Sequence, residues 1–281
     1  MMLEAVNVCY RYPRGVEALK NVNMQVNEGE ILGLLGPNGC GKTTLLLHFN
    51  GILEPHKGEI RFEDKKIEYN KKYLGKLRKK VGIVFQNPDD QIISPTVWQE
   101  VAFGPVNLGW SEDKVNGSVE NVLSLLKISH LRDEPSHHIS FGEKKKVSIA
   151  SIIAMDPEVI IFDEPTSNLD PKSASRMMKI IHDLNKKRRK TIIIATHDVD
   201  LAPVYIDKVC LMRDGTIVKS GSPKDVLLDK ESIRASNLRL PRVGHLVEIL
   251  MEEEGMNFDE IPLTIGQARR LIVDELNRKF R

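Results

Sequence analysis

Residues 30–43 read EILGLLGPNGCGKT. The run from Glu30 to Leu35 predicts a buried strand that is covered on both faces. The stretch after it, residues 36–43, has the pattern G-x-x-x-x-G-K-[ST] between a strand and a helix, which is the context of a phosphate-binding loop. Its glycines let backbone N–H groups converge on phosphate oxygens at a helix N-terminus. The stretch therefore predicts an α/β fold that binds a nucleoside triphosphate.

This loop supplies most of the expected nucleotide contacts. Lys42 is expected to neutralise the β- and γ-phosphates, and the Thr43 hydroxyl is expected to bind Mg²⁺. Cys40 is interpreted as a packing substitute for serine. The predicted cofactors are therefore ATP and Mg²⁺. The residues predicted to bind the nucleotide here are Gly36, Pro37, Asn38, Gly39, Cys40, Gly41, Lys42, Thr43 and Thr44.

Two further apolar runs, Val159–Phe162 and Thr191–Ala195, also predict covered strands. Ligands of open α/β sheets bind at the carboxyl ends of the strands, so the polar residues that follow these runs point to the same site as the loop. Asp163 is expected to hold Mg²⁺ directly or through water. Glu164 could polarise the attacking water. The alternative is a charged pair that merely ends a buried strand.

Other patterns place smaller units around this core. Alternating side chains over residues 6–12, together with the run 59–62, suggest a small antiparallel β subdomain. Residues 111–129 carry a helical stripe of apolar side chains. We therefore expect an inserted helical subdomain at about residues 88–156.

The end of the chain has a different character. Thr264 and Gln267 form a capping box that opens a last helix. We interpret residues 239–281 as a C-terminal helical appendage to a main domain of residues 1–238. The predicted fold class is α/β, a P-loop NTPase core with an antiparallel β subdomain, an inserted helical subdomain and this appendage.

Composition argues against several classes of function. The 41 Lys and Arg nearly balance the 39 Asp and Glu, so no global field favours nucleic acid. Three scattered cysteines support neither a zinc site nor a disulfide framework. No apolar run approaches the roughly 20 residues that cross a bilayer. We therefore expect no nucleic-acid partner, and we expect other subunits to hold the chain at any membrane.

Four more motifs occur in a characteristic order. Gln86 follows the run Val81–Phe85, residues 140–144 read SFGEK, residues 167–170 read SNLD, and His197 ends the last strand. Together with the loop and the acidic pair, they resemble the ATP-binding cassette family over about residues 3–238.

The resemblance implies a role for each motif. Gln86 would ligate Mg²⁺ through its carbonyl and hydrogen-bond the lytic water. His197 would donate a hydrogen bond to the γ-phosphate. The implied catalytic residues are Glu164, His197 and Gln86, and the implied Mg²⁺ ligands are Thr43, Gln86 and Asp163.

The motif at 140–144 has two interpretations. Ser140 and Glu143 form a capping box, so the motif could simply begin a helix. The family resemblance instead implies that Ser140, the Gly142 amide and Asp170 contact ATP held by a second copy, because a helix N-terminus attracts anions. Two chains would then enclose two nucleotides head to tail. The sequence departs from the usual family pattern, with Phe141 in place of glycine and Glu143 in place of glutamine.

An aromatic residue upstream of the loop could stack on adenine, as in this family. Tyr12 is favoured over Tyr10, and ordinary strand packing is the alternative for both.

Several runs resemble one branch of the family. Residues 86–91, QNPDDQ, look like the ATPase subunits of energy-coupling-factor transporters, which import vitamins and transition-metal ions. Residues 103–109, 196–203 and 238–241 resemble the cobalt and nickel members. The implied function is ATP-driven import of such an ion. Vitamin import remains an alternative, and a soluble cassette ATPase that acts on nucleic acid is a more distant one.

The same resemblance implies partners and a location. A second ATPase subunit, identical or different, would pair with the chain with the help of the appendage. A transmembrane coupling subunit would insert helices into a groove beside Gln86, near Trp98, Phe103 and Trp110, although these aromatic residues could equally belong to the core. A substrate-binding membrane subunit would carry the cargo. The chain would lie at the cytoplasmic face of the cell membrane as a peripheral subunit.

Overall fold

A six-stranded sheet carries the phosphate-binding loop. The computed structural model describes residues 1–279. The strand order in this sheet is β10-β9-β3-β8-β7-β6, and all neighbours are parallel except β9 and β10. The strands are β3 (Ile31–Leu35), β6 (Val81–Val84), β7 (Val159–Asp163), β8 (Thr191–Thr196), β9 (Lys208–Arg213) and β10 (Thr216–Gly221). Strands β3, β6, β7 and β8 are buried along their whole length, which confirms the predicted covered strands.

A second, antiparallel sheet packs beside the loop. Its order is β2-β1-β4-β5, from β1 (Leu3–Arg11), β2 (Glu17–Val26), β4 (Lys57–Phe62) and β5 (Lys65–Lys66). Strand β1 ends one residue before Tyr12, so the predicted alternation through Tyr12 is wrong at its end. The register also shifts between Ala5 and Val8, where Asn7 has a φ of 50°. Such a bulge breaks the two-residue period.

Helix α1 (Lys42–Phe49) follows the loop and joins the two sheets into one core. Leu45, Leu46 and Phe49 of α1 are fully buried in a cluster with Val8 of β1 and Leu34 of β3. Further along the chain, α2 (Lys71–Lys80) precedes β6.

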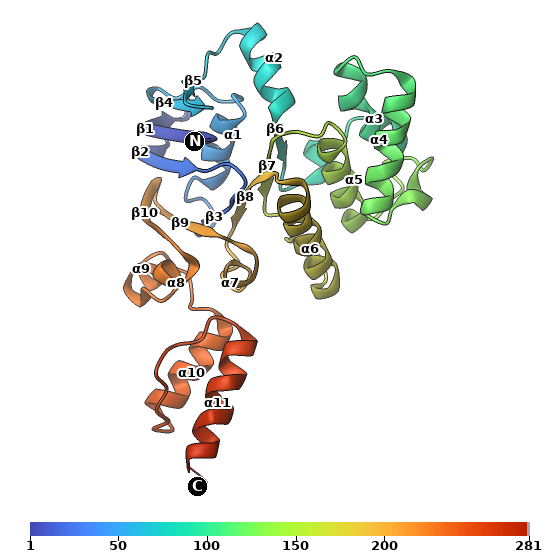
Figure 1. Ribbon diagram of the computed structural model, residues 1–281. Helices are drawn as coiled ribbons and strands as arrows, with labels where there is room; N and C mark the ends of the chain where they lie inside the picture. Colours follow the sequence, from blue (N-terminus) through green and yellow to red (C-terminus); the bar gives the residue numbers. More distant parts are fainter. Residues whose placement is uncertain (280–281) are drawn as a thin grey trace.

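Three helices form the predicted helical subdomain to one side of the sheet (Figure 1). They are α3 (Val97–Asn107), α4 (Glu112–Leu125) and α5 (Phe141–Ile153), with the short helices η1 (Pro88–Asp90) and η2 (Ser129–Leu131). The predicted apolar stripe on α4 is buried, with Val115, Val119, Val122 and Leu126 each at most 3% exposed.

The remaining helices of the main domain follow the strands β7, β8 and β10. They are α6 (Pro171–Arg188), α7 (Ala202–Tyr205), α8 (Pro223–Leu227) and α9 (Lys230–Ala235). Asp170 caps α6 through hydrogen bonds from the backbone N–H groups of Lys172 and Ser173, both at 3.0 Å. A side chain at the N-cap stabilises a helix start in this way.

The last two helices stand apart from the helical subdomain, beyond α7–α9 (Figure 1). They are α10 (Arg242–Glu252) and α11 (Ile265–Lys279), and they share a small core of Val247, Phe258 and Ala268. The expected capping box forms, because Thr264 N–H donates to the Gln267 side chain and Gln267 N–H donates to Thr264 Oγ1. Within residues 1–279, no helix is long and apolar enough to cross a membrane.

Candidate nucleotide-binding site

The loop opens onto a cavity of about 670 Å³ at the carboxyl ends of the parallel strands. Its lining comes from five parts of the chain, namely the segment 12–20, the loop, Gln86 after β6, the end of β7 and the turn between β9 and β10. The predicted site residues in the lining are Tyr12, Asn38, Gly39, Gly41, Lys42, Thr43, Thr44, Gln86, Asp163 and Glu164. The sheet therefore brings these residues together, whereas the predicted site residues Gly36, Pro37, Cys40 and His197 lie outside the lining.

Two glycines of the loop are required by close approach or backbone conformation. A Cβ at Gly36 would lie 2.4 Å from the carbonyl oxygen of Met212 and 2.7 Å from Cys40 Sγ. Gly41 has a φ of +109°, which side-chain-bearing residues rarely adopt. These constraints fix the loop against β9 and leave its backbone facing the cavity. Cys40 is buried beside Gly36, and burial raises the pKa of its thiol, in keeping with a packing role.

Lys42 is folded back onto the loop. Its ammonium donates to the carbonyl oxygens of Gly36 at 2.7 Å and Pro37 at 3.1 Å, and the residue is only 6% exposed. The ammonium also lies 3.8 Å from Glu164 Oε1. It is a concentrated positive charge at the place where phosphates would enter.

The two expected Mg²⁺ ligands of the loop and the acidic strand are in direct contact. Thr43 Oγ1 donates to Asp163 Oδ2 at 2.5 Å. Burial raises the pKa of Asp163, and the hydrogen bond from Thr43 opposes that shift.

This donor set fits Mg²⁺ bound together with a nucleotide. In the part of the chain that the structure describes, no three His, Cys, Asp or Glu side chains gather as a metal cage. Mg²⁺ is usually held by one or two protein oxygens together with phosphate and water. A hydroxyl and a carboxylate that meet beside the loop, with Gln86 on the same cavity, match that pattern.

Glu164 is held at the end of β7 by the neighbouring strand. Its Oε1 accepts hydrogen bonds from the His197 backbone N–H at 3.1 Å and lies 2.8 Å from His197 Nδ1. Its Oε2 accepts one from Thr196 Oγ1 at 3.3 Å. Glu164 is 3% exposed and has a φ of 48°, a conformation that non-glycine residues adopt with some strain. Its carboxylate is thus fixed beside an imidazole that is itself half exposed.

Ser140, Gly142 and Asp170 lie outside the lining of this cavity. Ser140 and Glu143 make the reciprocal capping box at the start of α5, and those hydrogen bonds lower the pKa of Glu143. Ser140 and Asp170 are exposed. A Cβ added at Gly142 would meet only Leu169 within 4 Å, so the α5 N-terminus is open for approach. A single chain does not bring these residues to its own loop.

The two tyrosines have different surroundings. Tyr12 lines the cavity and its hydroxyl lies 3.0 Å from Thr44 Oγ1. Tyr10 packs against the rings of Tyr12, His48 and His56, with centroids 4.9–5.1 Å apart. Tyr10 is therefore a packing residue, whereas Tyr12 faces the cavity.

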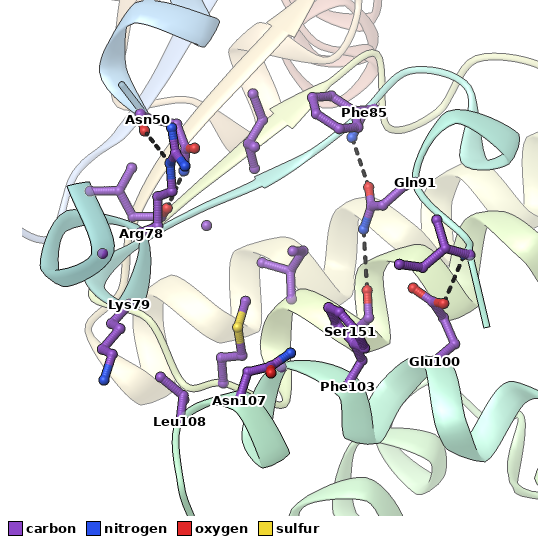
Figure 2. Close-up of a pocket in the computed structure, with 18 residues that line it drawn as sticks. Asn50, Arg78, Lys79, Phe85, Gln91, Glu100, Phe103, Asn107, Leu108 and Ser151 are labelled. Atoms are coloured by element: carbon purple, nitrogen blue, oxygen red, sulfur yellow. Dashed lines mark hydrogen bonds between the residues drawn. The ribbon is translucent and has the colours of Figure 1, made fainter. Parts of the chain in front are cut away.

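A second cavity, of about 600 Å³, lies between β6 and the helices α2, α3 and α5 (Figure 2). We call it the α3–α5 groove. Phe103 lines it and is 50% exposed, and Ile93 at its edge is 70% exposed. Gln91 crosses its wall, accepting from Phe85 N–H and donating to the Ser148 carbonyl oxygen and to Ser151 Oγ.

The two tryptophans follow the core alternative and not the groove alternative. Trp98 and Trp110 lie outside the lining of the groove and pack against the main core. Lys114 covers the Trp110 ring at 3.7 Å from its centroid. Both indoles are held in the helical subdomain, because their large rings fill the space between its helices and the core.

Sequence reasoning missed Lys145. It lies in the run Lys144–Lys146, which has the appearance of a solvated helix face, but its side chain is completely buried. Its ammonium contacts the backbone of both Gln86 and Glu164. No single-sequence signal separates this lysine from its neighbours.

Comparisons with known proteins agree with this geometry. A profile of the ABC transporter family matches residues 19–167. The chain is 54% identical over 278 residues to the energy-coupling factor transporter ATP-binding protein EcfA of Methanocaldococcus jannaschii, covering 99% of each chain. It is 48% identical over 279 residues to EcfA3 of Clostridium perfringens, covering 99% of this chain and 98% of the relative.

Solved structures show the same fold. CbiO1 from Clostridium perfringens, described as part of the ABC transporter complex CbiONQ, is 48% identical with a TM-score of 0.75, over 88% of this chain and 99% of that one. The ATP-binding cassette MJ0796, solved as a dimer bound to ADP and phosphate, is 27% identical with a TM-score of 0.73, over 79% of this chain and 99% of that one. The cavity, its acidic pair and these likenesses agree: the chain belongs to the ABC transporter family, as an ATP-hydrolysing subunit coupled to transport, among the energy-coupling-factor transporter ATP-binding proteins.

Proposed function

We propose that this chain powers the import of a transition-metal ion, cobalt or nickel, through a membrane energy-coupling-factor transporter. The observation that carries its ATPase role is the contact of Thr43 with Asp163 beside the buried Glu164. The metal cargo is supported by residues 103–109, 196–203 and 238–241, which resemble the cobalt and nickel members. Vitamin import through the same architecture is the second candidate.

Each loop residue has a role in this proposal. The backbone N–H groups of residues 36–44 bind the phosphates, and Lys42 turns from the Gly36 and Pro37 carbonyl oxygens to the β- and γ-phosphates. Thr43, Asp163 and Gln86 hold Mg²⁺, which when bound neutralises the charge that develops on the phosphates. The Tyr12 ring stacks on adenine.

Hydrolysis forms a bond between the water oxygen and the γ-phosphorus, breaks the bond from the γ-phosphorus to the bridging oxygen so that ADP leaves, and requires the transfer of one water proton. Glu164 accepts a proton from the attacking water, and its carboxylate is kept in place by His197 and Thr196. His197 donates a hydrogen bond to the γ-phosphate. Gln86 hydrogen-bonds the water through its side-chain amide.

The site is completed by a second ATPase subunit, identical or different. Ser140, Gly142 and Asp170 are exposed or at an open helix start, and the α5 N-terminus attracts anions. They would contact the γ-phosphate held by the partner's loop. The appendage supports the pairing, because Leu246, Val273 and Leu276 on α10 and α11 are exposed apolar side chains.

Membrane partners would use the α3–α5 groove. Its exposed Phe103 and Ile93 suit a helix of a transmembrane coupling subunit, which a substrate-binding membrane subunit would accompany. The chain would then sit at the cytoplasmic face of the membrane as a peripheral subunit.

Glu164→Gln should lower kcat for ATP hydrolysis about 10²- to 10⁴-fold, because it removes the base and keeps the shape. ATP affinity should stay close to that of the unmodified chain. Phosphate release and nucleotide binding measure the two effects. Glu120→Gln, an exposed change on α4, is the control. A Glu164→Gln chain with full hydrolysis would disprove the assignment of this base.

Phe103→Asp should abolish co-purification of the transmembrane subunit from cells, because a charge would have to be buried in the apolar groove. ATP hydrolysis by the isolated chain should be unchanged. Val204→Asp, an equally exposed apolar position on α7, is the matched control and should retain the complex. Retention of the complex by the Phe103→Asp chain would show that the groove is not the docking site.

The cargo is tested with the purified complex in membrane vesicles. We expect ATP-dependent uptake of radioactive Co²⁺ or Ni²⁺, and loss of this uptake with the Glu164→Gln subunit. Uptake of a vitamin without uptake of either metal would contradict the metal cargo and favour the second candidate.

A further inference from the structure

A single buried lysine connects the helix that faces the partner subunit with the catalytic residues of its own chain. Lys145 lies in the second turn of α5, five residues after Ser140, and its residue exposure is 0%. A buried charge costs free energy unless it is well hydrogen-bonded, so its partners define what it does.

The Lys145 ammonium has three donors and uses all of them on three different segments. It donates to the Gln86 carbonyl oxygen at 2.7 Å, to the Glu164 carbonyl oxygen at 2.8 Å, and to Ser167 Oγ at 3.3 Å. Ser167 Oγ in turn donates to the Glu164 carbonyl oxygen at 2.9 Å. The lysine therefore holds the chain after β6, the end of β7 and the turn before α6 at one point.

Burial lowers the pKa of this ammonium to about 8, and the nearby carboxylates of Glu164 and Asp163 oppose that shift. An apolar side chain of the same length would fill the space without this cost. The cost is consistent with a role in fixing geometry rather than in filling the core.

Two further contacts join α5 to the segment that begins at Gln86. Lys144 Nζ lies 2.7 Å from Asp89 Oδ1. Gln91 Nε2 donates to the Ser148 carbonyl oxygen at 2.6 Å, on the wall of the α3–α5 groove. Residues 86–91 are thus attached to α5 at both ends, whereas Lys145 alone extends the connection to Glu164.

We propose that Lys145 is a positioning residue that makes the α5 N-terminus, the Gln86 segment and the Glu164–Ser167 turn move as one unit. The proposal rests on the function proposed above for Gln86 and Glu164. When Ser140 meets the partner's nucleotide, α5 shifts, and the ammonium transmits that shift to the backbone of Gln86 and Glu164. Lys145 lies outside the nucleotide cavity, so it acts through these residues and not on the nucleotide.

Lys145→Met tests this in the full-length chain, because methionine keeps the length and removes all three hydrogen bonds. We expect kcat for ATP hydrolysis to fall about 10- to 100-fold, as for other residues that orient catalytic groups. Affinity for ATP, measured by nucleotide fluorescence on the single chain, should change less than about twofold. Lys187→Met, an exposed lysine on α6, should match the unmodified chain in both.

A double-mutant cycle with Ser167→Ala provides the second readout. Its result depends less on whether one variant folds fully than does the kcat of the Lys145→Met chain alone. Ser167→Ala alone should lower kcat by a smaller factor, and it should lower kcat no further in the Lys145→Met chain. Thermal unfolding is followed for every variant, so that kcat refers to folded protein.

The outcomes separate the two proposals. If the folded Lys145→Met chain keeps its kcat, or if the two substitutions lower kcat independently, the positioning role is overturned. If instead the unmodified chain does not hydrolyse ATP, or Lys42→Ala leaves hydrolysis unchanged, the proposed function itself is contradicted. A fall in kcat at constant ATP affinity, which Ser167→Ala does not increase further in the Lys145→Met chain, supports the positioning role.

Discussion

The parallel pairing of β3, β8 and β7 is the constraint on which the site depends. It places the ends of three buried strands side by side, so that the loop and the acidic pair share one cavity and His197 contacts Glu164. Thr43 and Asp163 are 120 residues apart in sequence, and they meet only because these strands pair in register. The hydrogen bonds from β8 to Glu164 follow from the same pairing.

The arrangement leaves the site incomplete within one chain. Ser140 and Asp170 cap helices with the same side chains that the proposal assigns to a partner's nucleotide. Capping keeps each helix start in place and exposed, so the structural and the functional interpretation of these residues agree. Lys145 connects the α5 N-terminus back to Glu164, and in our proposal this connection is the mechanical path between the partner's nucleotide and the catalytic base.

Much of this could be predicted from the sequence because covered parallel strands are short, apolar and followed by polar residues. The loop, the acidic pair and the α4 stripe are examples. The features that the sequence did not predict depend on packing between distant segments. Trp98 and Trp110 fill core space instead of the groove, Asn7 introduces a bulge into β1, and Lys145 is buried within a lysine run. Each depends on contacts with distant segments, which local pattern and composition do not encode.

The central claim is that the γ-phosphate is bound by two chains. A structure of the Glu164→Gln chain with ATP and Mg²⁺, paired with itself or with its partner ATPase, tests it directly. The account predicts Ser140 Oγ and the Gly142 amide of one subunit within hydrogen-bond distance of the γ-phosphate held by Lys42 of the other. A closed, ATP-bound site in which the γ-phosphate contacts only its own chain would contradict it.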